Sequence, residues 1–280
     1  MPAEGSTFAR RALGQQLRTL RERAEVSQAA AARVLGISPQ TMGRLEEGLS
    51  ARSASDLYMN TLCNLYHVSD KERQLILALA HETRVTAKWG GGWWRPHLDR
   101  DITDFDPYAA LEHQATRLTA WAVIRLPVLV RTPDYSRAVA WTDTPNAPTH
   151  HTEERVHREL KRQARLDDPD FTAEIILSEA ALREEWGGPA VMAEQRQHLT
   201  ELGQRPNISI RVVPFTTRNH IGASLGSFSL LEFPMMPKSR MTQPPIVHIE
   251  EHVGDLYLER SKEVARYTSA ITELRRLASA

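Results

Sequence analysis

The chain has 280 residues with 35 Lys or Arg and 35 Asp or Glu, so its formal net charge is zero and a general affinity for polyanions is excluded. This length suits two domains, one of about 85 residues and one near 180. The longest apolar runs fall far short of the roughly 18 residues that span a bilayer, and the N-terminus has no hydrophobic stretch. We therefore expect a cytoplasmic protein without a signal peptide or a membrane segment.

The first 86 residues predict five helices around one apolar centre. Three of them cover about residues 10–24, 55–66 and 69–84, the last two beginning at Ser-Asp pairs that can cap a helix. The single cysteine, Cys63, lies on an apolar face and excludes disulfides within the chain. The residues expected to face inward are Leu13, Leu17, Leu20, Leu57, Leu62, Leu65, Leu75, Ile76 and Leu79.

Between the first and the second of these three helices, two short helices are joined by a glycine turn. Ser27 is placed to cap the first of the two, and Gly36 supplies a left-handed stop that a residue with a β-carbon resists. Ser38 caps the second, with Pro39 at its first position, where a missing N–H costs nothing. Two helices joined this closely must cross at a steep angle, as in a helix-turn-helix that reads DNA.

Helical spacing gives the second short helix an inner and an outer face. Ile37, Met42 and Leu45 point inward. Glutamine and arginine side chains can form paired hydrogen bonds with adenine and guanine edges in the major groove. The residues left facing outward, and expected to meet DNA, are Pro39, Gln40, Thr41, Gly43 and Arg44.

Positive charge is concentrated where this motif lies. Residues 8–52 contain eight Arg against four Glu, a net charge of 8 − 4 = +4. Phosphate contacts position a DNA-binding domain without reading sequence. The arginines expected to make such contacts, each with a solvated surface arginine as the alternative, are Arg10, Arg11, Arg18, Arg23 and Arg52.

The segment from Gln28 to Gly48 resembles the helix-turn-helix of the XRE, or lambda-repressor-like, regulators, and the match covers about residues 10–85. The match includes Gln28, Gly36 and the Ser38-Pro39-Gln40-Thr41 stretch, and Ser38 is counted among the residues expected at the DNA. The resemblance implies that Gln28 contacts the DNA backbone and that Gln40 and Arg44 face bases. It also implies that Glu46 pairs with Arg21 and so holds the recognition helix at its angle. A helical bundle used for protein contact remains the alternative.

Three consecutive glycines at 90–92 then break the helical pattern, flanked by tryptophans. The predicted organisation is a DNA-binding domain at 8–86, a linker at 87–105 and a second domain at 106–280. The tryptophans are expected to anchor the linker on a neighbouring surface, with an aromatic ligand clamp as the alternative.

The second domain begins with helical patterns. Leu111, Ala115, Leu118 and Ala122 form a stripe that predicts one long helix after Asp106. Two further helices are expected at about 133–140 and 152–166, the second carrying mixed charges typical of a solvated face, with a second nucleic-acid surface as the alternative.

The last hundred residues switch to strand patterns. A strand at 172–177, a helix at 189–203 and a strand at 208–212 predict a parallel pair with a right-handed crossover. The second domain is therefore expected to be a mixed α/β unit, one sheet covered by helices. The remaining elements expected are strands at 227–233, 246–250 and 255–259 and a final helix from Lys262 with Val264, Tyr267, Ile271 and Leu274 inward or at an interface.

Residues 93–278 resemble a domain found behind the helix-turn-helix in actinobacterial regulators of the WhiJ-like type. The resemblance rests on the order of short motifs along the chain, among them Trp93-Trp94, Leu126–Tyr135, Trp186–Met192, Val213–Phe215 and Val247–Glu250. This chain has Pro-Val-Leu-Val-Arg-Thr at 127–132, where members of that family typically show Pro-Gly-Leu-Leu-Gln-Thr. The resemblance implies transcriptional control of differentiation or antibiotic production, often with a small partner protein in an antitoxin-like arrangement.

Catalytic signatures are missing from the sequence. There is no Gly-x-Ser-x-Gly elbow, phosphate loop or His-Glu-x-x-His helix, and we expect neither enzymatic activity nor a metal or other cofactor. Two weak alternatives are a metal site among His150, His151 and His157, for which solvated histidines are the better account, and a site where three strand-end carboxylates converge. Those carboxylates are Glu232, Glu250 and Glu259.

The sequence thus predicts a DNA-binding transcriptional regulator. One reader domain contacts few base pairs, so we expect a homodimer on an inverted-repeat operator, with the final helix as its interface. The second domain is expected to bind a small-molecule effector or a small cognate protein. The alternatives are an antitoxin-like protein that sequesters such a partner and represses its own operon, and an enzyme tethered to DNA.

Overall fold

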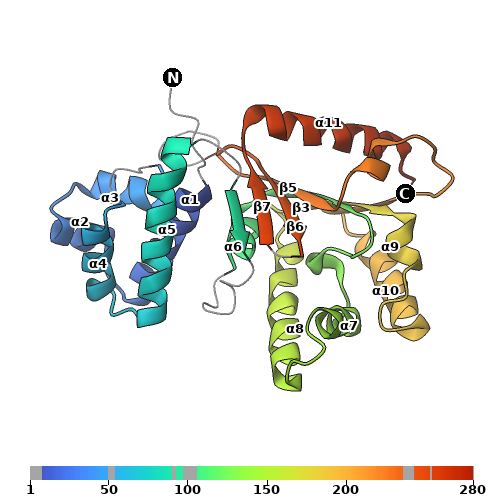
Figure 1. Ribbon diagram of the computed structural model, residues 1–280, viewed down its shortest axis with the longest axis horizontal. Helices are drawn as coiled ribbons and strands as arrows, with labels where there is room; N and C mark the ends of the chain where they lie inside the picture. Colours follow the sequence, from blue (N-terminus) through green and yellow to red (C-terminus); the bar gives the residue numbers. More distant parts are fainter. Residues whose placement is uncertain are drawn as a thin grey trace. The chain divides into compact units, whose positions relative to one another are not determined.

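The computed structural model describes residues 8–49, 54–89, 93–96, 106–235, 243–252 and 254–279. These form two compact units (Figure 1). The first contains residues 1–111 together with 251–261, and the second contains 112–250 together with 262–280. The first unit therefore includes a short segment that lies far along the chain, inside the predicted second domain.

The described part of residues 8–89 forms the five predicted helices. They are α1 (Phe8–Arg23), α2 (Gln28–Leu35), α3 (Pro39–Glu46), α4 (Asp56–Leu65) and α5 (Asp70–Trp89). The last runs about five residues beyond its predicted end. Their common core contains buried side chains from each helix, including Leu13, Leu17, Leu35, Met42, Leu45, Met59, Leu62 and Ile76.

One inward prediction in these helices is wrong. Leu57 is 73% exposed, whereas Cys63 is buried as predicted. The buried stripe of α4 runs through Met59, Leu62, Cys63 and Tyr66, at the spacing of one helix face. Leu57 comes two residues before the first of these, which places it about 200° around the helix, on the solvent side.

Two antiparallel strands also belong to the first unit. Strand β1 (Trp93–Pro96) pairs with β7 (Gly254–Leu258), so that Trp93 lies opposite Tyr257 and Pro96 opposite Gly254. Strand β1 falls within the predicted linker, where no strand was expected. The glycines at 90–92 and the tryptophan side chains of the predicted anchor or ligand clamp lie outside the described residues.

The predicted long helix at the start of the second domain is wrong. Helix α6 (Pro107–Gln114) ends early, and β2 (Arg117–Ala122) follows it as an inner strand of a sheet. The five residues of β2 from Leu118 onward are all buried. A strand covered on both faces is a continuous apolar run, and such a run cannot be told from a buried helix by periodicity.

The second unit contains the predicted mixed sheet, with described strands in the order β6-β5-β2-β3-β4. Strands β2, β3 and β4 are parallel, β5 is antiparallel to β2, and β6 is antiparallel to β5. The predicted parallel pair at 172–177 and 208–212 is confirmed. The remaining strand bounds are β3 (Thr172–Ser178), β4 (Ile208–Val213), β5 (Phe228–Glu232) and β6 (Ile246–Glu251).

Helices cover both faces of this sheet. In Figure 1, α7, α8 and α10 lie on one side of it and α11 lies on the other. Short 3-10 turns occur at 128–130, 164–167 and 221–224. The helix bounds are α7 (Pro133–Asp143), α8 (Thr149–Gln163), α9 (Glu179–Arg183), α10 (Pro189–Leu202) and α11 (Ser261–Leu277).

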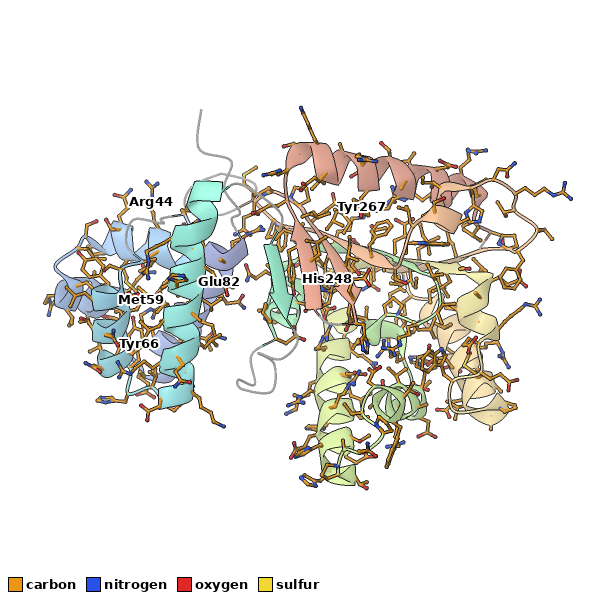
Figure 2. All side chains as sticks on the ribbon, viewed as in Figure 1. Arg44, Met59, Tyr66, Glu82, His248 and Tyr267 are labelled. Carbon is orange, nitrogen blue, oxygen red and sulfur yellow. The ribbon has the colours of Figure 1, made fainter. Side chains whose placement is uncertain are left out.

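The apolar stripe of α11 packs against the sheet of the same chain. Val264, Ile271 and Leu274 are buried, and Tyr267 lies on the sheet side of the helix with its ring 4.7 Å from that of Phe228 (Figure 2). The prediction that this stripe forms a dimer interface is therefore wrong, because the sheet of the same chain already covers it.

Arg131 is a buried arginine in the segment at 127–132, where this chain differs from the family that it resembles. Arg131 Nε donates to the carbonyl of Leu126 at 2.7 Å, and its Nη1 lies 3.5 Å from Glu159 on α8. Burial lowers the pKa of Arg131, and the charge of Glu159 opposes that effect. The added charge therefore has its own counter-ion inside the unit.

Candidate nucleic-acid interface

The turn between α2 and α3 is built from local hydrogen bonds, as predicted. The Oγ of Ser27 accepts from the N–H of Ala30 at 3.1 Å, and the Oγ of Ser38 accepts from the N–H of Thr41 at the same distance. Gly36 ends α2 in the left-handed conformation, with φ of 67°. Each helix end is therefore fixed by its own neighbours in sequence, before any distant contact forms.

Three of the outward residues predicted on α3 are exposed, namely Pro39, Gln40 and Arg44. Arg44 lies on the outer side of its helix (Figure 2) and has no ion-pair partner among the described residues. Thr41 is half-exposed, and its Oγ1 lies 2.8 Å from Ser38 Oγ. The exposed face of α3 thus presents an amide and a guanidinium, two groups that can read base edges.

Gly43 is not on that face, contrary to the prediction. It is buried, and a β-carbon at this position would lie 3.4 Å from the side-chain oxygen of Gln28. Gln28, at the start of α2, therefore lies against this position.

A buried carboxylate, Glu46, fixes the end of α3. Arg21 of α1 grips it with two hydrogen bonds, Nε to Oε1 at 2.6 Å and Nη2 to Oε2 at 3.1 Å. The Nε2 of Gln28 donates to Oε2 at 2.9 Å. Arg21 also donates to the carbonyl of Val26, in the turn before α2, at 3.0 Å. The expected pair of Arg21 and Glu46 is thus present, and it ties three helices together at the recognition helix.

This pair is strongly held. Its side chains are only 11% and 2% exposed for Arg21 and Glu46. The hydrogen bond to Glu46 raises the pKa of Arg21. A bidentate pair between a planar guanidinium and a carboxylate fixes direction as well as distance. The angle of α3 is therefore set by a rigid contact, with Gln28 as its second donor.

Two glycines let α1 approach α3 with no side chain between them. A β-carbon on Gly14 would lie 2.6 Å from the backbone carbonyl oxygens of both Leu45 and Glu46. Gly48 has φ of 69°, and a β-carbon there would lie 2.9 Å from the Cα of Arg11. Gly14 was not among the residues predicted to shape the site, although a glycine inside a helix of leucines and glutamines is a signal of close packing.

The five arginines predicted to contact phosphates differ in their surroundings. Arg18 is exposed and pairs with Glu22 at 3.0 Å, and Arg23 pairs with Glu72 at 2.6 Å. Arg10 is half-buried, and Arg52 lies outside the described residues. Surface pairs of this kind are worth little, so Arg18 and Arg23 can exchange their carboxylates for phosphates at small cost.

The prediction that Arg11 contacts a phosphate is wrong. It is only 4% exposed, and its backbone lies directly against the turn at Gly48. Burial lowers its pKa to about 10, and the nearby charge of Glu259 opposes that change. A phosphate cannot reach a side chain that is buried to this extent. Arg33 on α2, which the prediction omitted, is exposed and has no ion-pair partner among the described residues.

Gly14→Ala is expected to lower the free energy of unfolding by about 1–3 kcal/mol, the usual cost of overpacking. The added methyl would meet backbone oxygens of α3, which cannot rotate away. Urea denaturation of the purified variant measures the loss. Ala29→Gly, at an exposed position on α2, serves as a comparison in which only helix propensity changes. A Gly14→Ala protein as stable as the parent would show that α1 and α3 do not touch at this point.

The two weaker alternatives from the sequence were a histidine metal site and a site at three strand-end carboxylates, and the described residues support neither. No group of three metal-ligating side chains occurs in the described part of the chain. His150 and His151 are exposed and meet edge to face at 4.3 Å, and Glu232 lies 3.8 Å from Arg117. Among the helices described, none combines the length and the apolar character needed to cross a membrane.

The chain carries a DNA-binding type of module, because a helix-turn-helix domain model matches residues 12–76. Residues 105–280 match a second family, described as a domain of unknown function (DUF5753). That match covers more than half of the chain, and the protein belongs to this family. No curated protein and no solved structure matches the chain.

Proposed function

We propose that this protein is a sequence-specific transcriptional regulator that binds an inverted-repeat operator as a homodimer. The observation that carries the proposal is the pairing of a rigidly held helix with an exposed reading face. Glu46 and Arg21 fix the direction of α3, and Gln40 and Arg44 stand free on its outer side. A reader of base edges needs both properties, since a misplaced side chain forms no paired hydrogen bonds.

The dimer follows from the size of the reader. One recognition helix contacts only a few base pairs, which is too little to single out a site in a genome. Two readers related by a two-fold axis would bind half-sites about one helical turn apart. The interface lies elsewhere than on the stripe of α11, which the chain's own sheet covers.

The second unit is proposed to bind an effector and to change operator affinity by a coupling of about 1–3 kcal/mol. Its size supports this role, since it exceeds what DNA reading requires. We propose binding rather than catalysis for this unit.

An antitoxin-like role is the second candidate, and one observation favours it. The second unit exposes large apolar side chains, with Phe215 59% and both Ile124 and Trp141 41% exposed. Arg183 stacks over the Phe215 ring at 5.8 Å. Exposed aromatic and arginine side chains are typical of protein interfaces. Purification from the native host followed by mass measurement separates the two candidates, because a stoichiometric small protein would support only the second.

Arg44→Ala is expected to weaken operator binding by about 1–3 kcal/mol and to relax sequence preference at one position of each half-site. The operator is first obtained by selection from random duplex DNA. Fluorescence anisotropy then compares Arg44→Ala with Lys71→Ala, which removes a positive charge at an exposed position on α5. Equal affinity of both variants for the operator, with unchanged base preference, would refute a reading role for Arg44.

A further inference from the structure

Two neighbouring cavities open at the amino ends of β3 and β4 in the second unit. Their volumes are about 490 and 280 Å³, and both are lined by Leu166, Asp167 and Arg205. The smaller one lies between the end of α8 and the end of α10. None of the residues lining it belongs to the helix-turn-helix or to any contact described for it.

Leucine side chains from three elements contribute to the wall of the smaller cavity. Leu129, Leu160 and Leu202 come from the 3-10 turn after β2, from α8 and from α10. Leu129 and Leu202 are buried, and Leu160 is half-buried. The rest of the wall is mainly polar, and its polar side chains are Gln163, Asp167, His198 and Arg205. A small molecule with an apolar part and a polar or charged group matches such a mixed lining, and the volume lies just below the usual range of ligand sites.

Two polar side chains of the wall keep hydrogen-bonding capacity. His198 is half-buried and makes no hydrogen bond within the described residues. Burial lowers its pKa, so that at neutral pH one ring nitrogen donates and the other accepts. The Nε2 of Gln163 donates to the carbonyls of Val128 and Arg131, at 2.9 and 2.8 Å, while its Oε1 accepts nothing from the described residues.

Arg205 provides the charge at the rim. Its Nη1 donates to Asp167 Oδ1 at 2.7 Å, and the two side chains are 44% and 70% exposed. An ion pair so exposed contributes little, so a competing carboxylate can displace Asp167 at small cost. The guanidinium has five N–H donors in a planar fork, which fits a carboxylate with two parallel hydrogen bonds.

We propose that the smaller cavity binds a small carboxylic acid with an apolar body. The carboxylate pairs with Arg205, and the body, about the size of one aromatic ring or a short alkyl chain, lies among the three leucines. His198 and Gln163 then select among acids that carry a further polar group. The assignment of this cavity as the regulator's effector site rests on the proposed function. The binding of the acid to the cavity does not.

Calorimetric titration of the full-length protein with phenylacetate and with hexanoate tests the site, in the absence of DNA. Phenylacetamide, a neutral analogue of the first acid, is the matched ligand control. We expect saturable binding of at least one acid, with phenylacetate about two- to fivefold tighter than phenylacetamide, because the ion pair with Arg205 is exposed to solvent and supplies only a modest preference.

Two variants locate the binding. Arg205→Gln is expected to weaken acid binding about two- to fivefold and to remove the preference over the amide. Ala164→Phe, at an exposed position that lines the cavity, fills the space and is expected to abolish binding of both. Arg266→Gln, at an exposed position on α11, removes the same charge on the other side of the sheet and should bind as the parent does. Thermal melting confirms that each variant is folded.

The proposal is overturned if neither acid binds saturably up to millimolar concentration, or if binding survives both Arg205→Gln and Ala164→Phe. Either result leaves the proposed operator binding unaffected, because the titration contains no DNA. Conversely, a protein that binds the acid as expected but selects no DNA sequence would refute the proposed function and retain the site.

Discussion

Removal of residues 261–280 is expected to unfold the second unit. Helix α11 covers one face of the sheet, and Val264, Ile271 and Leu274 are buried there. Each such side chain contributes about 1.5–3 kcal/mol by leaving water, so the three together approach the 5–15 kcal/mol that stabilises a whole domain. The truncation also removes Arg275, whose guanidinium donates to the carboxylate of Glu174 at 2.5–2.9 Å.

Hydrogen exchange with mass spectrometry measures this outcome, since it reports each unit of the full chain separately. Peptides from β2 and β3 should lose protection in the truncated protein, while those from α1 to α5 keep it. Two point variants grade the effect. Ile271→Ala should cost about 2–5 kcal/mol, and its neighbour Thr272→Ala, exposed on the same helix, less than about 0.5 kcal/mol. Protection of the sheet in the truncated chain would show that α11 is dispensable for folding.

Glu46→Ala is the second change with a large expected effect, a loss of about 3–5 kcal/mol in the free energy of unfolding of the first unit. The substitution leaves Arg21 charged and only 11% exposed, without its bidentate partner and with the longer contact to the exposed Glu22, at 3.4 Å, as its remaining ion pair. Operator binding should fall further than the stability loss alone predicts, because α3 loses the contact that fixes its angle. Denaturation in urea and anisotropy titration measure the two effects on the same preparation.

Glu47→Ala is the matched control, since Glu47 is the next residue, carries the same charge and is half-exposed. It should change stability by less than about 0.5 kcal/mol. A second variant, Arg21→Met with Glu46→Leu, replaces both charges by apolar groups and is expected to recover most of the stability. If Glu46→Ala and Glu47→Ala behave alike, the buried pair does not hold the recognition helix.

The two short helices of the reader could be predicted from sequence because their boundaries depend on neighbouring residues. Ser27 and Ser38 accept hydrogen bonds from groups three positions on, and Gly36 needs no distant partner. Such signals are local, so a single sequence contains them. The pair of Arg21 with Glu46 is different. It joins residues 25 positions apart, and only the resemblance to a known family indicated it.

Burial was predicted less well, for one physical reason. Arg11 and Gly43 were assigned to a DNA-facing surface, yet Arg11 is buried and Gln28 lies against Gly43. Periodicity indicates which residues share a helix face, but the partner that packs on a face is set by the tertiary fold. The same limit explains β2, since its apolar run fits a buried helix as well as a strand with two neighbours.

The pairing of β1 with β7 also bears on how the chain folds as it leaves the ribosome. Helices α1 to α5 all lie within the first 89 residues and can pack together once that stretch has emerged. Strand β1 follows them, but its partner is synthesised about 160 residues later, which is roughly 10–30 s at ordinary translation rates. During that interval the hydrogen-bonding edge of β1 has no partner from β7. A nascent chain in this state is the stage at which a chaperone would have most to protect, and slower translation between the two strands would lengthen it.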